Sequence, residues 1–258
     1  PGDHKYRFGH ALVLGGATAT GAGRLACRAA LRVGAGLVTA GVPSAALPVY
    51  AQDTAAVITA PVDDAAALDR LLADDRLNAL LLGPGAGVGQ DTAERGRKLL
   101  ATGRGVVLDA DALTSFAGSA DALSASVQGP TVLTPHAGEF ARLFPDLDGD
   151  KLTRTRTAAR QSGAVVLLKG ADTVIAAPDG RAAINANAPA DLATAGAGDV
   201  LAGLVTGALA QGLPAFEGAC AAAWLHGEAA QGHGPGLIAD DLPDRVPGAL
   251  ARLKAGAQ

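Results

Sequence analysis

The sequence predicts an α/β protein, a three-layer α/β/α sandwich with a mainly parallel central sheet. Short runs rich in Val, Leu and Ile recur along the chain, each followed by turn-forming residues and then by a longer stretch rich in Ala and Leu. That alternation is typical of parallel strands joined by crossover helices. The chain has 258 residues, 49% of them hydrophobic, which is enough for one substantial core and short for two. No Pro/Ser-rich linker or repeat divides it, so a single domain over residues 1–258 is expected.

The strands are assigned to apolar runs that end in small or polar residues. Two alternating segments around the turn tripeptide PDG also predict a hairpin, over residues 172–185. The strands before the hairpin are expected at residues 11–16, 36–42, 56–61, 79–84, 105–111, 131–135 and 164–170.

The helices are assigned to the Ala/Leu-rich stretches between these runs. Their apolar residues recur at the spacing of one helix face. The clearest are expected at residues 21–34, 63–74, 91–103, 198–212 and 214–231.

The stretch ATAGAGDVLAGL predicts an anion site at the start of a helix. In open parallel sheets the ligand lies beyond the carboxyl ends of the strands, where such a turn stands. Gly196 and Gly198 bracket the turn, and the backbone N–H groups of a helix start attract phosphate. Asp199 has two interpretations that the pattern leaves open. It is either a helix-capping acid or a general base that takes a proton from an attacking hydroxyl.

Two further strand ends carry polar side chains. Lys169 and Gly170 follow an apolar run, where the Lys either neutralises phosphate oxygens or is simply exposed. Thr134, His136 and Glu139 follow another run. His136 is a candidate for orienting a substrate or transferring a proton. Glu139 is a candidate for holding a metal-bound water, although a first-turn helix acid is the plainer interpretation.

Several familiar motifs are missing. The stretch LGGATATGAGRLA lacks the GxGxxG spacing, with Ala26 at the next required position, which argues against a Rossmann dehydrogenase. Neither a P-loop, a GxSxG elbow nor a Cys/His metal cluster occurs in the sequence. The run VVLDADAL is assigned to a strand, where side chains alternate, so only one of Asp109 and Asp111 is expected to face the ligand crevice.

The composition argues against nucleic acid and membrane as partners. Lys and Arg number 21 against 25 Asp and Glu, a net charge of −4, and aromatic residues make up only 3%. No apolar run has the length of a membrane span, and the start of the chain does not look like a secretory signal, so a cytoplasmic protein is expected. Cys27 and Cys220 are interpreted as reduced core residues rather than as a disulfide or redox pair.

Taken together, the strand ends resemble the ADP- or ATP-dependent NAD(P)H-hydrate dehydratase family of the ribokinase-like superfamily. The combination of TPHxGE with KGxxT separates this family from other kinases of the fold. The stretches that carry the resemblance are, in order, HKYRFGHALVLGGATATGAGRLACRAALRVGAGLVTA, LLLGPGAG, VVLDADAL, TPHAGEFARLF, LLKGADTVIAAPDG, ATAGAGDVLAGLVTGALAQG and WLHGEAA.

The resemblance implies a repair lyase that acts on hydrated NADH or NADPH, which carries a hydroxyl on the reduced nicotinamide ring. A phosphoryl group from ADP, or from ATP in eukaryotic members, is transferred to that hydroxyl. Phosphate then leaves and the intact coenzyme is regenerated. The resemblance also implies Mg²⁺ as a cofactor, a homo-oligomer such as a tetramer, and an epimerase as a partner, either as an upstream domain or as a separate protein.

The resemblance implies a role for each matching position. Asp199 matches the catalytic base that contacts the hydrated nicotinamide, and Glu139 lies where related kinases organise Mg²⁺. The substrate-binding positions are Ala22, Gly85, Gly87, His136 and Asp199, and the nucleotide-binding positions are Lys169, Gly170, Ala171, Asp172, Thr173 and Gly198.

Two alternative functions stay open, and one of them, a silent module, follows from a departure from the family pattern. The turn reads AGAGD where many members have GGTGD or AGSGD, so Ala197 lacks a hydroxyl that would bond a phosphate oxygen. The alternatives are a small-molecule kinase of the same fold, such as a hydroxyethylthiazole kinase, and a catalytically silent nucleotide-binding module. Epimerase activity is not expected from these residues.

Overall fold

A computed structural model describes residues 5–256, with side chains described for residues 7–255. One nine-stranded sheet runs through it in the order β3-β2-β1-β4-β5-β6-β7-β8-β9. The pairs from β3 to β7 are parallel, and β8 and β9 form an antiparallel hairpin at one edge. The strands are β1 His10–Leu14, β2 Leu37–Val42, β3 Val57–Pro61, β4 Leu77–Leu82, β5 Gly105–Leu108, β6 Thr131–Leu133, β7 Val165–Leu168, β8 Thr173–Ala176 and β9 Ala182–Asn185.

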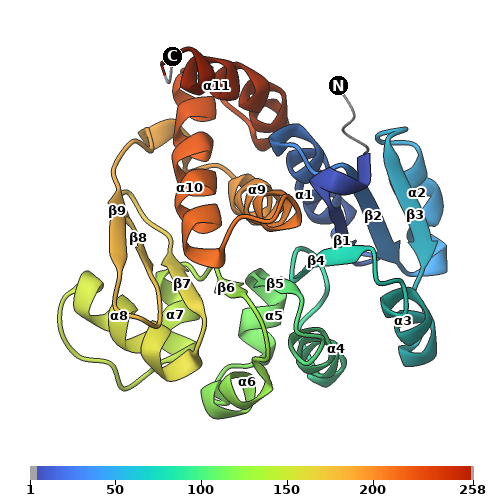
Figure 1. Cartoon of the computed structure of the whole chain (residues 1–258), viewed down its shortest axis with the longest axis horizontal. Coiled ribbons are helices and arrows are strands. Elements are labelled where there is room, and N and C mark those ends of the chain that lie inside the picture. The colour runs from blue at the N-terminus through green and yellow to red at the C-terminus, as the bar shows by residue number, and fades with distance from the viewer. Residues whose placement is uncertain (1–4, 257–258) are drawn as a thin grey trace.

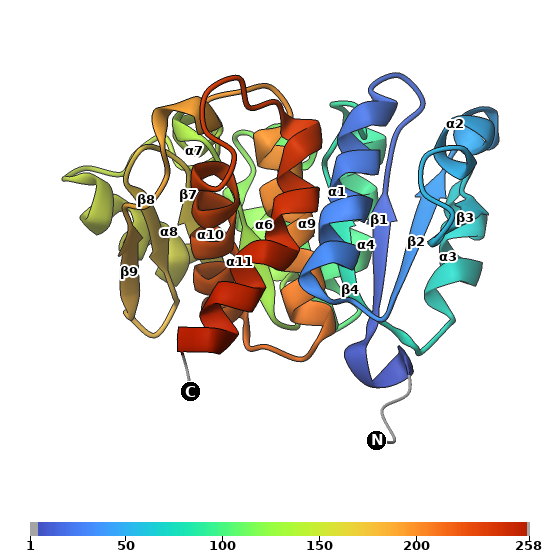
Figure 2. The same cartoon turned by 90° about the horizontal axis from the view of Figure 1, so that it is seen from above.

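Helices cover both faces of the sheet, which confirms the predicted three-layer sandwich (Figures 1 and 2). Helices α1, α9, α10 and α11 pack on one face, and α3 to α8 pack on the other. The α-helices are α1 Thr20–Val33, α2 Leu47–Ala51, α3 Ala65–Leu72, α4 Gln90–Leu100, α5 Ala110–Ser115, α6 Ala120–Ser126, α7 Ala137–Leu143, α8 Lys151–Ser162, α9 Ala197–Ala210, α10 Ala215–Gln231 and α11 Leu242–Gly256.

Each central strand supplies two separate cores, because successive side chains of a strand point to opposite faces. In β1, Ala11 and Val13 belong to the core under α1 and α9, whereas Leu12 and Leu14 belong to the core under α4. The same alternation holds in β4. The face with α9 therefore receives smaller residues from these strands, which lets the glycine-containing helix α9 lie close to the sheet.

The expected strand over residues 105–111 was wrong at its end. β5 stops at Leu108, and Asp109 is the N-cap of α5. The alternation argument for Asp109 and Asp111 was wrong, because residues two apart in a strand point to the same face and because Asp111 lies in the first turn of a helix. The prediction gave no residue range for the helices α2, α5, α6, α7, α8 and α11, although it interpreted Glu139 as an acid in the first turn of a helix.

The two cysteines do not pair with each other, in agreement with their interpretation as reduced residues. Cys27 is buried and Cys220 half-buried, and both are free thiols. Burial raises the pKa of the Cys220 thiol to about 11, so this thiol is protonated at neutral pH. The core position predicted for Cys220 is only partly realised.

No helix within residues 5–256 combines the length and apolar character that crossing a membrane requires.

Candidate active site

Helix α9 begins with a glycine in the left-handed region. Gly196 is the N-cap with φ +89°, and no side chain caps the helix. A Cβ at Gly196 would lie 2.8 Å from Leu25 Cδ1 and 2.9 Å from Ala239 Cβ, so glycine suits both the backbone and the space. The first N–H groups of a helix have no acceptor within the helix and carry its positive dipole end. The start of α9 is therefore not blocked by a capping side chain, and the anion site at this position stays a prediction.

Lys169 stands beside the start of α9 at the end of β7. Its Nζ would lie 3.3 Å from a Cβ on Gly198, so glycine there leaves room for the ammonium. The Lys169 side chain is only 19% exposed and pairs with Asp109 Oδ1 at 2.8 Å. Burial by itself lowers the pKa of the ammonium, but the carboxylates of Asp109 and Glu139 outweigh it and raise that pKa above its usual value. The interpretation of Lys169 as a simply exposed residue is wrong.

Asp109 is a buried member of the site that the sequence prediction left out. Its side chain is 2% exposed and accepts hydrogen bonds from Lys169 Nζ at 2.8 Å and from Thr134 Oγ1 at 2.9 Å. The short strand β5, which lies between β4 and β6, places Asp109 directly beyond the edge of the sheet. The motif VVLDADAL carried this signal. It was missed because the strand was extended past residue 108.

Asp199 combines an uncapped position with an altered acidity. It lies in the first turn of α9 but makes no capping hydrogen bond, so the capping interpretation is not supported. Burial raises the pKa of Asp199 to about 6, and the negative charge of Asp109 adds to the effect, whereas Lys169 opposes it. A carboxylate with this pKa is ionised at neutral pH and is a much better proton acceptor than an ordinary one.

His136 and Glu139 cap the start of α7. The Nδ1 atom of His136 accepts from the amide of Gly138 at 2.9 Å, and Glu139 Oε2 accepts from the amide of His136 at 2.8 Å. This reciprocal arrangement is a capping box in which His replaces the usual Ser or Thr. Glu139 is buried and lies 4.0 Å from Lys169 Nζ, so this helix-capping acid also borders the anion site.

The residues at this site suit Mg²⁺ when the phosphates of a bound nucleotide supply further ligands. Of the described residues, no group of three or more His, Cys, Asp and Glu side chains could hold a metal ion. Mg²⁺ keeps several waters and is usually bound by one or two carboxylates together with substrate phosphates. Glu139 therefore suits an indirect contact, through water, with a metal ion carried by phosphates.

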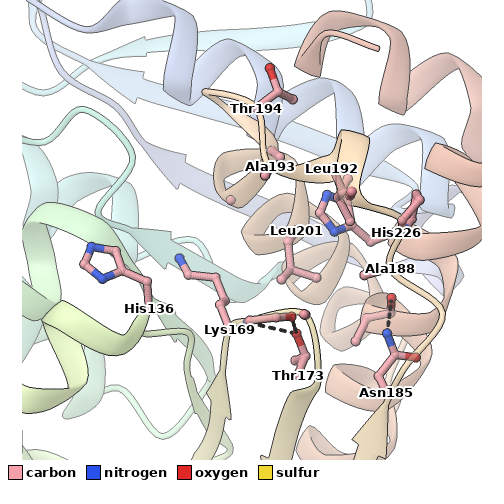
Figure 3. Close-up of a pocket in the computed structure, with 17 residues that line it drawn as sticks. His136, Lys169, Thr173, Asn185, Ala188, Leu192, Ala193, Thr194, Leu201 and His226 are labelled. Atoms are coloured by element: carbon pink, nitrogen blue, oxygen red, sulfur yellow. Dashed lines mark hydrogen bonds between the residues drawn. The ribbon is translucent and has the colours of Figure 1, made fainter. Parts of the chain in front are cut away.

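A pocket of about 600 Å³ opens beside the start of α9. Figure 3 shows His136 and Lys169 on one side of it and His226 on the other. The predicted nucleotide residues all line this pocket except Asp172, which is exposed and pairs with Lys151 Nζ at 2.8 Å. The residues that line the pocket are His136, Lys169, Gly170, Ala171, Thr173, Asn185, Ala188, Pro189, Ala190, Leu192, Ala193, Thr194, Ala197, Gly198, Leu201, Ala223 and His226.

The other predicted substrate positions form a second group outside the pocket lining. Ala22 lies in the first turn of α1. A Cβ on Gly85 would lie 2.5 Å from the carbonyl oxygen of Ala19, so the loop that holds Gly85 packs against the start of α1. The amide of Gly87 donates to Asp111 Oδ2 at 2.8 Å, and the charge of Asp111 also raises the pKa of Asp199. Asp111 thus bonds Gly87 directly and acts on Asp199 through its charge.

Comparison with known proteins places this chain in a family. The fold and the anion site at α9 define a ribokinase-like α/β protein. The family model described as NAD(P)H-hydrate dehydratase matches residues 11–242. The chain belongs to the NAD(P)H-hydrate dehydratase family.

Three relatives illustrate the match. A bifunctional NAD(P)H-hydrate repair enzyme of Salinibacter ruber is 41% identical over 96% of this chain and 49% of its own length. An ADP-dependent (S)-NAD(P)H-hydrate dehydratase of Neisseria meningitidis is 38% identical over 93% of this chain and 84% of its own. The crystal structure of an ADP/ATP-dependent NAD(P)H-hydrate dehydratase from Bacillus subtilis, co-crystallised with ATP/Mg²⁺ and soaked with CoA, has a TM-score of 0.82. Its identity is 29%, covering 98% of this chain and 94% of that one. The chain spans about half the length of the bifunctional relatives it matches.

Proposed function

We propose that this chain dehydrates hydrated NADH and NADPH, with ADP as the phosphoryl donor. The observation that carries the proposal is the half-buried, uncapped Asp199 in the first turn of α9, where Lys169 Nζ also stands beside Gly198. Burial raises the pKa of Asp199 to about 6, which suits a general base. Water is a poor leaving group and phosphate a good one, so transfer of a phosphoryl group to the ring hydroxyl prepares its departure. Family membership supports the same substrate and nucleotide.

The proposed reaction begins with a proton transfer. Asp199 accepts the proton of the ring hydroxyl while the hydroxyl oxygen attacks the β-phosphorus of ADP. The bond from that phosphorus to the bridging oxygen breaks, and AMP leaves. The carbon–oxygen bond then breaks and releases phosphate, and loss of a proton from the neighbouring ring carbon restores the double bond of NADH. The sum is the hydrate and ADP giving NADH, AMP and phosphate.

The other residues hold the phosphates during this transfer. The amides at the start of α9 and the ammonium of Lys169 lie where negative charge develops on the transferred group. Asp109 holds Lys169 in place through the 2.8 Å ion pair. Glu139 would contact Mg²⁺ through water, and that ion would neutralise phosphate charge when bound. Ala22, Gly85, Gly87 and His136 are proposed to contact the hydrated coenzyme.

The proposal is tested by incubating the protein with hydrated NADH, Mg²⁺ and either ADP or ATP. Recovery of absorbance at the reduced-nicotinamide band is expected with ADP. No recovery with either nucleotide would reject the proposal, and a stable phosphorylated product would point to a kinase instead. Homo-oligomer formation, a cytoplasmic location and an epimerase partner stay predictions from the sequence.

A further inference from the structure

His226 of α10 is a buried polar residue in the wall of the pocket. It is 6% exposed, and its Nε2 has no hydrogen-bond partner. Of the pocket-lining residues, all of which lie in the described part of the chain, His226 alone carries a buried side-chain nitrogen or oxygen without a partner. An unpartnered buried polar atom costs free energy, so a ligand that bonds to it gains affinity.

The imidazole of His226 is neutral at neutral pH. Burial lowers its pKa to about 4, although the backbone of Ala197 favours the charged form, and the positive charge of Lys169 lowers it further. A neutral ring presents one N–H donor and one acceptor nitrogen. It is therefore suited to an uncharged polar group of a ligand rather than to a phosphate.

Two other polar side chains that line the pocket are bonded within the protein. Thr173 Oγ1 donates to the carbonyl of Gly170 at 3.0 Å, and Asn185 Nδ2 donates to Asn187 Oδ1 at 2.8 Å. Figure 3 shows the His226 ring beside Leu192 and Leu201, away from Lys169. The pocket thus has a charged end at Lys169 and a mainly apolar end whose wall contains the buried, unpartnered Nε2 of His226.

A ligand that fits both ends has phosphates joined to a flat, mostly apolar body with a few polar atoms. ADP has this chemistry, with its nucleoside as the body. None of the lining residues is Phe, Tyr or Trp, so the nucleoside is held without ring stacking on a side chain of these types. Apolar contact and a single hydrogen bond then carry its recognition.

We propose that Nε2 of His226 hydrogen-bonds the nucleoside half of bound ADP, at an amine of the base or a hydroxyl of the ribose. The inference rests on the proposed function only in taking ADP as the occupant. His226, on α10, would then distinguish ADP from nucleotides that have the same phosphates but a different nucleoside.

The first test measures the Kd of ADP by calorimetry in wild-type protein and in three variants. The amide of His226→Gln reaches the position of Nε2, whereas that of His226→Asn reaches the position of Nδ1, and His226→Leu removes both. We expect His226→Gln to stay within a few-fold of wild type, and the Asn and Leu variants to bind roughly ten- to a hundredfold more weakly. Unchanged binding by His226→Leu, or rescue by Asn rather than Gln, would overturn the proposal.

Controls separate this effect from damage to the fold. Leu225→Ala removes a buried neighbour on the same helix that does not line the pocket, and it should leave the Kd of ADP unchanged. Inorganic pyrophosphate, which lacks a nucleoside, should bind all variants equally. A loss of pyrophosphate binding that matches the loss of ADP binding would show a general defect and reject the role of Nε2.

The second test identifies the bonded group with inosine diphosphate, 2′-deoxy-ADP and 3′-deoxy-ADP. The analogue that lacks the partner of His226 should bind wild type weakly and lose nothing more in His226→Leu. Equal further loss for all three analogues would exclude a hydrogen bond to these groups. Because binding is measured without turnover, this test can fail while the dehydratase reaction stands. A wild-type protein that binds no ADP would reject both.

Discussion

Asp199 lies in the first turn of α9 without capping it, and this leaves its carboxylate available to a substrate. Because burial raises its pKa to about 6, it is ionised above that pH and protonated below it. As a general base it must be ionised, so we expect turnover to fall as the pH drops through about 6. Asp199→Asn should lower turnover by at least about a hundredfold while ADP still binds. A pH–rate profile of the wild type and calorimetry of the variant check this, and an active Asn variant would contradict the role.

Asp109 acts indirectly. It pairs with Lys169, and its negative charge raises the pKa of Asp199. Removing its charge in Asp109→Asn should lower the pKa of Asp199, since the charge of Asp109 now raises it. The acid limb of the pH–rate profile should therefore move to lower pH, and ADP should bind more weakly because Lys169 loses its 2.8 Å partner. Asp121→Asn, on the exposed first turn of α6, serves as a control. An unshifted acid limb would show that Asp109 is only structural.

The residues most visible from the sequence were those at strand ends followed by glycine. Lys169, Gly198 and Asp199 stand in local motifs whose chemistry can be argued from a few neighbours, and the structure brings them together. Asp109 was hidden because the predicted strand ran three residues past the end of β5. His226 was hidden because a His in an Ala-rich helix looks like a core residue, and only the packing of α10 against α9 turns it toward a pocket.

At the scale of elements, helices that follow strand ends were the hardest to predict. Only Asp109 separates the end of β5 from the start of α5 at Ala110, so no run of turn-forming residues marks the boundary. The chain turns there through a positive φ of +43° at Ala110, a conformation that the sequence does not signal with a glycine. Helix α8 has an Asp150 cap, and only four of its twelve residues are buried, two of them Ala and none of them large and apolar. The long apolar helices α9 and α10 were predicted to within one residue at their starts, because tertiary burial and sequence pattern agree there.

The close packing of α9 on α1 depends on a glycine in the helix interior. A Cβ at Gly203 would lie 2.3 Å from the carbonyl oxygen of Ala26, which belongs to the backbone and cannot move aside. Gly→Ala in an exposed helix gains about 0.5–1 kcal/mol, but here we expect Gly203→Ala to lose about 1–3 kcal/mol. Urea unfolding would measure this. Gly21→Ala, in the first turn of α1 with nothing within 4 Å of a new Cβ, is the matched control. A stabilised Gly203→Ala protein would mean that the two helices can separate at little cost.

At the scale of the whole molecule, the architecture was predictable because alternation of apolar runs encodes it directly. The site was predictable only in parts, since its walls come from segments far apart in the chain: the ends of β5, β6 and β7, the starts of α7 and α9, and the body of α10. Neighbouring strands bring the polar ends together by parallel pairing. The contribution of α10 depends instead on how helices pack on one face, for which the sequence carries no comparable local signal.

A ligand that touches all of these segments should stabilise the molecule as a unit. ADP at a hundred times its Kd should raise the free energy of unfolding by about 2.7 kcal/mol. For a chain of this size each kcal/mol corresponds to about 2–4 °C, so the Tm should rise by about 5–10 °C. Pyrophosphate at the same absolute concentration should give a smaller rise, because it reaches only Lys169 and the start of α9. Lys169→Ala should reduce the shift from both ligands, whereas His226→Leu should reduce only that from ADP. Equal shifts from ADP and pyrophosphate would show that α10 takes no part in binding.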